Sequence, residues 1–264
     1  MNKLPFEYQQ ALIAAKEASE IIIDFYEQGF TTEIKSDGSP VTQADLASSL
    51  KIQEHLIKTN IPVLGEESIH PEFEIRKNWT KNWCVDPLDG TKEFIKKNGE
   101  FSVCIALIEN NTPTFGVIAW PIKKKILVGG EGFGVFIVDF EDIDQNNKWE
   151  KLETKSSKNN PLVVLGSRSF HSHSEDYIEN LKKNHTEVVF KEKGSALKFF
   201  DLASGTADIY PRFAPTMEWD IAAGQAILNE LGGEVLNVET GKPLTYNKEN
   251  LLNPFFIAKT KPMI

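Results

Sequence analysis

The spacing of apolar residues predicts a chain that begins with two helices. Apolar side chains recur every three or four positions over residues 5–28, and Gly29 then marks the end of the first helix. The second helix is expected to start at Thr42 and to run to about Lys58. One stripe of this helix carries Leu46, Leu50, Gln53 and Ile57.

Strands replace helices between Pro62 and Val138. Residues 101–107 alternate large and small side chains, which is typical of a sheet whose two faces are buried unequally. Shorter strands are expected at residues 83–85, 114–120, 126–129 and 135–138, and a glycine-rich turn at residues 129–132. The first half is therefore expected to combine helices with an antiparallel sheet.

The second half of the chain alternates strands with helices. Residues 141–160 are polar and are expected to form a surface loop, so the predicted sub-domains of a single unit (residues 1–264) are about 1–145 and 146–264. Beyond the loop, strands are expected at residues 162–165, 187–190 and 234–238, and helices at residues 175–183, 195–204 and 219–231. Because this alternation favours a more α/β second half, the expected fold class is α+β.

Composition and charge exclude several classes of protein. The chain has 264 residues, of which 41% are hydrophobic and 25% charged, a profile that excludes collagen-like, coiled-coil and wholly disordered proteins. The 38 acidic and 29 basic residues give a net charge of −9, which argues against a nucleic-acid partner because duplex DNA is a polyanion. A small anionic substrate remains compatible with this charge, since a bound metal ion can invert the field inside one site.

The cysteines and the lack of long apolar runs indicate the compartment. Cys84 and Cys104 each lie in an apolar, strand-like run, and two buried thiols are typical of a reducing cytoplasm. No apolar run approaches the roughly 18 residues that span a bilayer, and the N-terminus has no signal-peptide pattern. We therefore expect no integral membrane segment and a cytoplasmic location, with peripheral attachment at the inner face of the membrane as a variant.

The segment Asp86-Pro87-Leu88-Asp89-Gly90-Thr91 carries the most informative chemistry. It follows a buried strand, and its proline and glycine are expected to turn the chain so that both carboxylates aim at one point. Hard oxygen ligands suit Mg²⁺ better than zinc, and the N–H groups of Gly90 and Thr91 could bind a phosphate oxygen. Taken alone, the segment also fits an ordinary turn.

Two further carboxylates strengthen the hypothesis of a metal site. Glu66 follows the strand that ends at Leu64, and Asp220 lies in the first turn of the helix expected at residues 219–231. Each has an ordinary explanation, as a solvated loop residue and as a partner of the helix dipole. Their combination with Asp86 and Asp89 favours the metal site.

The order and separation of these motifs resemble a known family along nearly the whole chain. The sequence is similar to the inositol monophosphatase superfamily of Mg²⁺-dependent, lithium-sensitive phosphatases, through Gly65-Glu66-Glu67-Ser68, Asp86-Pro87-Leu88-Asp89-Gly90-Thr91 and Trp219-Asp220-x-Ala222-Ala223-Gly224. Residues 37–45, 92–95, 167–169, 194–199 and 210–216 resemble its adenosine 3′,5′-bisphosphate nucleotidase branch. The resemblance implies a layered α-β-α-β-α sandwich that binds two or three Mg²⁺ ions.

The resemblance also implies catalytic roles. Glu66, Asp86 and the carbonyl oxygen of Leu88 would hold one Mg²⁺, and Asp86, Asp89 and Asp220 would hold the second. A water molecule activated near Glu66 and Thr91 would attack phosphorus, with Asp45 paired to the Thr91 hydroxyl. Asp45 also fits a capping box with Thr42, and both roles can hold at once.

Substrate contacts are implied in the same way. They comprise Glu66, Leu88, Asp89, Gly90, Thr91, Arg168, Gly194, Ser195, Lys198, Tyr210, Arg212 and Asp220. Among these, Lys198, Arg212 and Arg168 would bind the second phosphate and the adenosine. The branch has His directly after Ser-Arg-Ser, whereas Phe170 precedes His171 here, which leaves a role for His171 open.

The expected function is Mg²⁺-dependent removal of the 3′-phosphate from adenosine 3′,5′-bisphosphate, a small-molecule substrate. An inositol or sugar monophosphatase of the same superfamily is the alternative. An aspartyl-phosphate phosphatase fits less well, because its aspartates are separated by one residue and Asp86 and Asp89 by two. A non-catalytic nucleotide or phosphate sensor would lack a metal ligand or Thr91, and all are present. The oligomeric state is not set by the sequence.

Overall fold

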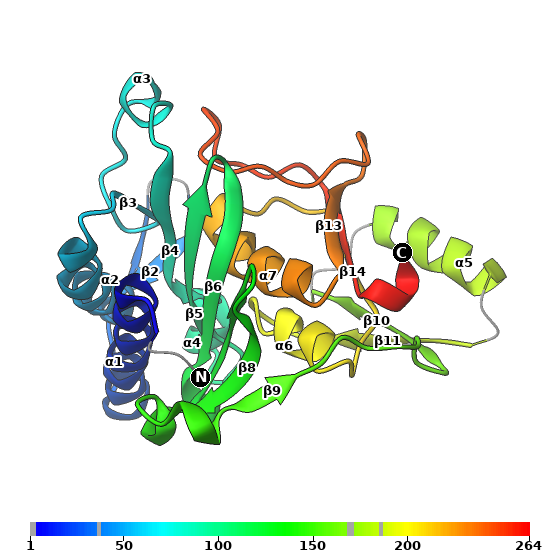
Figure 1. Ribbon diagram of the computed structural model, residues 1–264, viewed down its shortest axis with the longest axis horizontal. Helices are drawn as coiled ribbons and strands as arrows, with labels where there is room; N and C mark the ends of the chain where they lie inside the picture. The colour runs from blue at the N-terminus through cyan, green and yellow to red at the C-terminus, as the bar shows by residue number, and fades with distance from the viewer. Residues whose placement is uncertain (1–3, 36–37, 168–171, 185–186) are drawn as a thin grey trace.

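Five alternating layers of helix and sheet make up the computed structural model, which describes residues 4–35, 38–167, 172–184 and 187–264 (Figure 1). The first layer holds α1 (Phe6–Gln28) and α2 (Gln43–Leu56), the middle layer α6 (Lys198–Ala203) and α7 (Glu218–Glu230), and the last layer α5 (Ser172–Asn184). A seven-stranded sheet separates the first two helical layers, and a five-stranded sheet separates the last two. The expected layered α+β fold is confirmed.

The seven-stranded sheet is antiparallel except at one edge. In order across the sheet its strands are β3 (Val63–Gly65), β4 (Lys81–Asp89), β5 (Ser102–Glu109), β6 (Thr112–Trp120), β7 (Lys125–Gly130), β8 (Gly134–Asp139) and β9 (Glu150–Leu152). Only β3 and β4 pair in parallel. Because β9 lies in the segment expected to be a loop and pairs with β8, the sheet continues beyond residue 145.

The two faces of this sheet are buried against different partners. On β5, Val103, Ile105 and Leu107 pack under α1 and α2, whereas Cys104 and Ala106 face α7. The smaller residues bring α7 close: a Cβ on Gly116 of β6 would lie 2.2 Å from the carbonyl oxygen of Ala223. The expected alternation of large and small side chains is confirmed, and it sets the distance between the sheet and α7.

Helix α2 presents its apolar stripe to solvent. Leu46, Leu50 and Ile57 are exposed, while the buried face of the helix carries small and polar side chains together with Ile52 and Leu56. Ser48 on that face donates to the carbonyl oxygen of Pro87 over 2.7 Å. The buried face therefore serves to hold the end of β4 in place as well as to fill the core.

The five-stranded sheet is mixed. Its order is β11 (Val188–Glu192), β10 (Leu162–Gly166), β12 (Ile209–Arg212), β14 (Phe256–Lys259) and β13 (Glu234–Asn237). The first three strands are parallel, and β14 runs antiparallel to both of its neighbours. The sequence analysis missed β14, a strand of four residues.

Short elements connect these layers. They are β1 (Thr32–Ile34), β2 (Pro40–Thr42), η1 (Ile57–Thr59), α3 (Phe73–Arg76), α4 (Thr91–Ile95), η2 (Pro121–Lys123), η3 (Phe140–Asp142), η4 (Asn146–Lys148) and η5 (Lys261–Met263). Cys84 and Cys104 are buried free thiols. Within the described residues, no helix combines the length and the apolar character needed to cross a bilayer.

Candidate metal and phosphate site

Three aspartates from two elements converge at the junction of β4 and α7. One carboxylate oxygen from each of Asp86, Asp89 and Asp220 lies within 4.8 Å of the others. The expected turn between Asp86 and Asp89 is wrong in one respect, because β4 continues through both residues. A β-bulge makes this possible. Asp86 pairs with Cys104 and Asp89 with Ser102, so between these two pairs β4 has one residue more than β5.

The burial of these carboxylates makes their negative charge costly. Asp86 is 2% exposed, and burial raises its pKa well above the usual range, with the charges of Glu66 and Asp89 raising it further. Burial, followed by the charge of Asp89, likewise raises the pKa of Asp220 to about 8. No lysine or arginine among the described residues forms an ion pair with the three aspartates. The three carboxylates thus form a group of oxygen donors with no direct ion-pair partner among the described side chains.

Hydrogen bonds fix one oxygen on each of these side chains. Asp86 Oδ1 accepts from the N–H of Leu88 over 2.9 Å, and Asp220 Oδ2 accepts from the N–H of Met217 over 2.9 Å. The second bond places Asp220 in the first turn of α7, where the helix N-terminus favours negative charge. Each carboxylate is oriented and keeps a further oxygen for a ligand.

Asp89 is held mainly by residues from the second half of the chain. Its Oδ2 accepts from the Ser195 hydroxyl over 2.6 Å, from the N–H of Ala196, and from the Ser102 hydroxyl over 3.4 Å. Ser195 adopts the left-handed conformation at φ 58°, which turns this loop toward Asp89. The hydroxyl expected to contact substrate therefore contacts Asp89. Ser102 was missed by the sequence analysis, because a serine at the start of a strand carries no distinctive pattern.

Asp45 and Thr91 form the expected pair. The Thr91 hydroxyl is 2.9 Å from Asp45 Oδ1 and 3.2 Å from the carbonyl oxygen of Leu88. Asp45 Oδ2 accepts from both the N–H and the hydroxyl of Thr42, which completes a capping box at the start of α2. Both interpretations of Asp45 hold in the structure. Burial raises the pKa of Asp45 above its ordinary value.

Glu66 lies close enough to Asp86 for its charge to raise the pKa of that aspartate, and it forms an ion pair with a lysine. Lys35 Nζ is 2.8 Å from Glu66 Oε1 and 2.5 Å from Glu67 Oε1. Despite this partner, burial raises the pKa of Glu66. Lys35 follows β1 in a polar stretch of sequence, where nothing distinguishes it from a solvated surface lysine. Sequence reasoning therefore missed it.

A small cavity of about 100 Å³ opens beside the aspartates. Its walls are formed by Asp89, Ser167, Ser195, Ala196, Lys198, Phe199, Tyr210, Arg212, Thr216, Asp220 and Ile221. Tyr210 is 3% exposed and packs edge-on against Phe199 and Phe256, so its ring forms a wall of the cavity. The cavity places the carboxylates and two cationic side chains around one space.

Lys198 and Arg212 are the two cations of this cavity. Lys198 is 3% exposed and donates to the carbonyl oxygens of Lys193 and Ser195 over 3.0 and 2.7 Å. Burial lowers its pKa to about 8. Arg212 donates to the Ser167 hydroxyl and to the carbonyl oxygen of Pro215, while its buried Nε has no partner among the described residues. Both side chains contribute positive charge to the lining of the cavity.

Two glycines allow the halves of the molecule to meet here. Gly90 has φ 92°, and a Cβ on it would lie 3.2 Å from the Cβ of Ser195. A Cβ on Gly194 would lie 3.0 Å from the carbonyl oxygen of Glu100, whose carboxylate accepts from the Gly194 N–H over 2.8 Å. Arg168 and His171, also considered from the sequence, lie outside the described residues.

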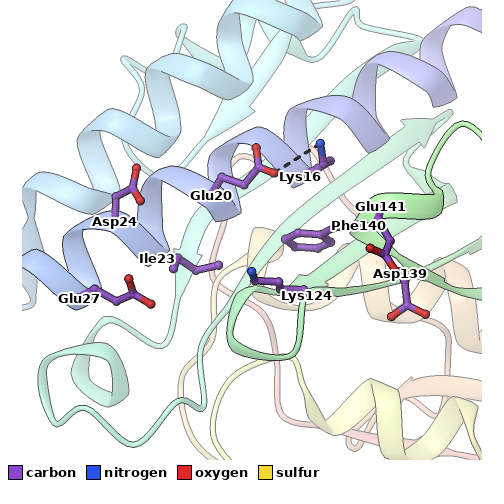
Figure 2. Close-up of a pocket in the computed structure, with 9 residues that line it drawn as sticks. All are labelled: Lys16, Glu20, Ile23, Asp24, Glu27, Lys124, Asp139, Phe140 and Glu141. Atoms are coloured by element: carbon purple, nitrogen blue, oxygen red, sulfur yellow. Dashed lines mark ion pairs between the residues drawn. The ribbon is translucent and has the colours of Figure 1, made fainter.

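A larger hollow of about 620 Å³ lies elsewhere, between α1 and the chain around η3 (Figure 2). Its lining comprises Lys16, Glu20, Ile23, Asp24, Glu27, Lys124, Asp139, Phe140 and Glu141. Figure 2 shows Ile23, Phe140 and Lys124 between two separated groups of acidic side chains. Within the described residues, the three clustered aspartates are the only group of acidic, histidine or cysteine side chains close enough together to hold a metal ion.

Comparisons with known proteins agree with this geometry. A family profile described as the inositol monophosphatase family matches residues 6–259. The chain is 38% identical over 253 residues to the 3′(2′),5′-bisphosphate nucleotidase CysQ of Salmonella typhimurium, an alignment that covers 94% of this chain and 97% of the relative. It superposes on the crystal structure of CysQ from Bacteroides thetaiotaomicron with a TM-score of 0.85, at 42% identity and 96% coverage of both chains. The suhB protein of Bartonella henselae matches with a TM-score of 0.76 at 25% identity, covering 96% of this chain and 93% of that one.

Proposed function

The chain belongs to the inositol monophosphatase family, and from this premise we propose that it removes the 3′-phosphate of adenosine 3′,5′-bisphosphate to give AMP and phosphate. The observation that carries the proposal is one cavity whose lining holds Lys198 and Arg212 together with Asp89 and Asp220, two of the three clustered aspartates. Relatives that are named as 3′(2′),5′-bisphosphate nucleotidases support the choice of substrate.

The carboxylate cluster fits Mg²⁺. Its donors are hard oxygens, and the raised pKa values of Asp86 and Asp220 indicate that the site favours either protons or a compensating cation. Asp86, Asp89 and Asp220 would hold one ion, and Glu66, Asp86 and the carbonyl oxygen of Leu88 a second. When bound, Mg²⁺ lowers the pKa of water and stabilises charge on phosphoryl and leaving-group oxygens.

Thr91 and Asp45 are suited to orient the attacking water. When the Thr91 hydroxyl donates to Asp45, its oxygen lone pairs are left to accept a hydrogen bond from water. Glu66 would accept from the same water on the other side. Because Asp45 is buried and already accepts two bonds from Thr42, it holds the hydroxyl in one orientation. The proposed nucleophile is thus water, and Asp86, whose Oδ1 accepts from the Leu88 N–H, is assigned to metal binding.

Lys198 and Arg212 distinguish a bisphosphate from a monophosphate substrate. With the 3′-phosphate at the aspartates, the 5′-phosphate would bind the two cations that line the same cavity. The unpartnered Nε of Arg212 offers a donor for a phosphate oxygen. We also assign substrate contacts to Gly90, Gly194, Ser195 and Tyr210, which lie at or beside this cavity, and to Arg168 on the family resemblance alone.

A substrate panel tests the proposal. Phosphate release is measured with Mg²⁺ from adenosine 3′,5′-bisphosphate and from inositol 1-phosphate, each with and without lithium. We expect far faster release from the bisphosphate and inhibition by lithium. Equal or reversed rates would replace the nucleotidase assignment by an inositol or sugar monophosphatase, and binding without turnover would indicate a sensor.

A further inference from the structure

Glu218 is a fully buried carboxylate at the start of α7, two residues before Asp220. Its Oε2 accepts from the N–H of Asn247 over 2.6 Å. Its Oε1 accepts from the N–H of Lys248 over 3.0 Å and from Lys248 Nζ over 2.5 Å. A buried charge is stable only when it is paired and hydrogen-bonded, and both oxygens of Glu218 meet this condition. The side chain therefore has one fixed position and holds a neighbouring part of the chain.

The part of the chain that Glu218 holds runs beside the start of α7. We call residues 247–253 the anchoring segment. The N–H of Glu218 donates to the carbonyl oxygen of Leu251 over 3.0 Å. The side-chain amide of Asn253 donates to the carbonyl oxygen of Met217, the N-cap residue of α7, over 2.7 Å. The backbone at the start of α7 is thus bonded to the anchoring segment at consecutive residues.

Met217 connects the anchoring segment to the metal site. The N–H of Met217 donates to Asp220 Oδ2 over 2.9 Å and so orients that carboxylate. The carbonyl oxygen of the same Met217 is held by Asn253. A displacement of the anchoring segment would therefore move the N–H group and turn Asp220 relative to the other two clustered aspartates. Mg²⁺ demands near-ideal octahedral geometry, so such a turn would weaken its binding.

Arg76 joins the anchoring segment to the part of the chain that carries Glu66. Arg76 is buried at the end of α3, in the connection between β3 and β4. Its guanidinium group donates to Asn247 Oδ1 over 3.1 Å and to the carbonyl oxygens of Lys248 and Glu249 over 2.5 and 2.8 Å. The side-chain amide of Asn247 donates back to the carbonyl oxygen of Arg76 over 2.7 Å. The anchoring segment thus contacts both the start of α7 and the connection that begins at Glu66.

Asp208 shows the same chemistry away from the metal site. It is fully buried and accepts from the N–H groups of Asn159 and Val163 over 2.9 and 2.8 Å. Lys155 Nζ lies 3.3 Å from its Oδ1. Asp208 directly precedes β12, whereas Arg212, which lines the cavity, is the last residue of that strand. It therefore serves as a matched control for a buried carboxylate that binds two N–H groups and a lysine.

We propose that Glu218 is a positioning residue for Mg²⁺ binding, because it anchors the segment that holds Met217 and thereby Asp220. This inference rests on the proposed function, since it concerns the Mg²⁺ site assigned there. Groups that orient metal ligands from outside typically change metal affinity by about 10- to 100-fold. The charge of Glu218 is offset by Lys248, so its effect on the metal is assigned to geometry.

Calorimetric titration of Mg²⁺ without substrate tests this role. E218Q keeps the size of the side chain and removes its charge, whereas E218D keeps the charge and withdraws the carboxylate by one methylene group. We expect the Kd for Mg²⁺ to rise about tenfold or more in both variants, with KM for the bisphosphate at saturating Mg²⁺ changed by less than about twofold. The control D208N should lower Tm and leave the Kd for Mg²⁺ at its wild-type value.

A neutral variant separates geometry from charge. N253A removes the bond to the Met217 carbonyl oxygen, so the Kd for Mg²⁺ should rise about two- to tenfold, as for the loss of one hydrogen bond. Asn82, buried near the start of β4 and bonded to the carbonyl oxygen of Trp83 over 3.2 Å, supplies the control N82A. Wild-type Mg²⁺ affinity in folded E218D or in folded N253A would overturn the positioning role. If the Glu218 variants do not fold, N253A alone decides. Absence of Mg²⁺ binding by the wild type would instead overturn the proposed function.

Discussion

The hydroxyl oxygen of Thr91 lies 2.9 Å from Oδ1 of Asp45, and this contact joins the start of α4 to the start of α2. Asp45 is fixed from its other side by Thr42. The capping box of α2 therefore also aims a hydroxyl at the carboxylate site. Under the proposed function, Asp45 both stabilises the start of a helix and positions the Thr91 hydroxyl that would orient the attacking water.

Replacing Thr91 tests this double role. T91V keeps the side-chain shape and removes the hydroxyl, so kcat should fall by about 10²-fold or more, as for loss of a general acid–base contribution. T91S restores the hydroxyl and should recover most of the activity. The measurement is steady-state phosphate release, with thermal unfolding as the check on folding. Equal activity in T91V and T91S would show that the hydroxyl has no part in the reaction.

The stability of the metal-free protein should depend on pH in an unusual direction. The folded-state pKa of Asp220 is about 8 against an ordinary value of 3.8, and that of Asp86 is raised as well. Between the ordinary pKa of 3.8 and the folded-state pKa of about 8, Asp220 binds more protons in the folded state than in the unfolded state. The contribution of this group to stability is therefore greatest at low pH and is lost as the pH rises toward 8.

Thermal unfolding in EDTA measures this dependence. We expect Tm to fall between pH 5 and pH 8 by a larger amount in the wild type than in D220N, which cannot take up the charge. Added Mg²⁺ should raise Tm most at the upper end of the range. A Tm that rises with pH by the same amount in both proteins would contradict the charge assignment.

The sequence predicts those parts of the site that lie in local motifs and misses those that depend on contacts between distant segments. Asp86, Asp89 and Asp220 were found because they lie in compact sequence motifs, two beside a predicted buried strand and one in the first turn of a predicted helix. Lys35 and Ser102 were missed, since an ion pair and a hydroxyl contact between distant segments leave no periodic trace. The bulge in β4 was also missed, because the proline and glycine around it favour a turn and pairing with β5 overrides that preference.

Ser102 offers a test of the positioning of Asp89. It is fully buried and lies 2.5 Å from the Ser195 hydroxyl and 3.4 Å from Asp89 Oδ2. S102A should weaken Mg²⁺ binding by about two- to tenfold, which corresponds to one hydrogen bond, and should change kcat at saturating Mg²⁺ less. Calorimetric titration of Mg²⁺ gives the affinity. Ser204, exposed after α6, provides the control S204A, and an identical affinity in S102A and S204A would remove Ser102 from the site.

Replacing Arg212 should raise KM for the bisphosphate substrate and leave KM for a monophosphate substrate nearly unchanged. R212A removes a charge-assisted contact to the 5′-phosphate, so KM for adenosine 3′,5′-bisphosphate should rise about tenfold or more. KM for inositol 1-phosphate, which has a single phosphate, should change little. The control K124A removes a cation from the separate hollow of Figure 2. An equal rise in both KM values would show that Arg212 does not select the bisphosphate.

The most direct measurement is phosphate release from adenosine 3′,5′-bisphosphate across one Mg²⁺ titration, in the wild type and in D86N. Asp86 is the buried member of the cluster and the ligand assigned to both ions. We predict saturable, Mg²⁺-dependent release by the wild type and a rate lower by about 10³-fold or more in D86N, because the loss of a preorganised charge contact has effects of this size. Wild-type rates in folded D86N, or release that is independent of Mg²⁺, would contradict the account.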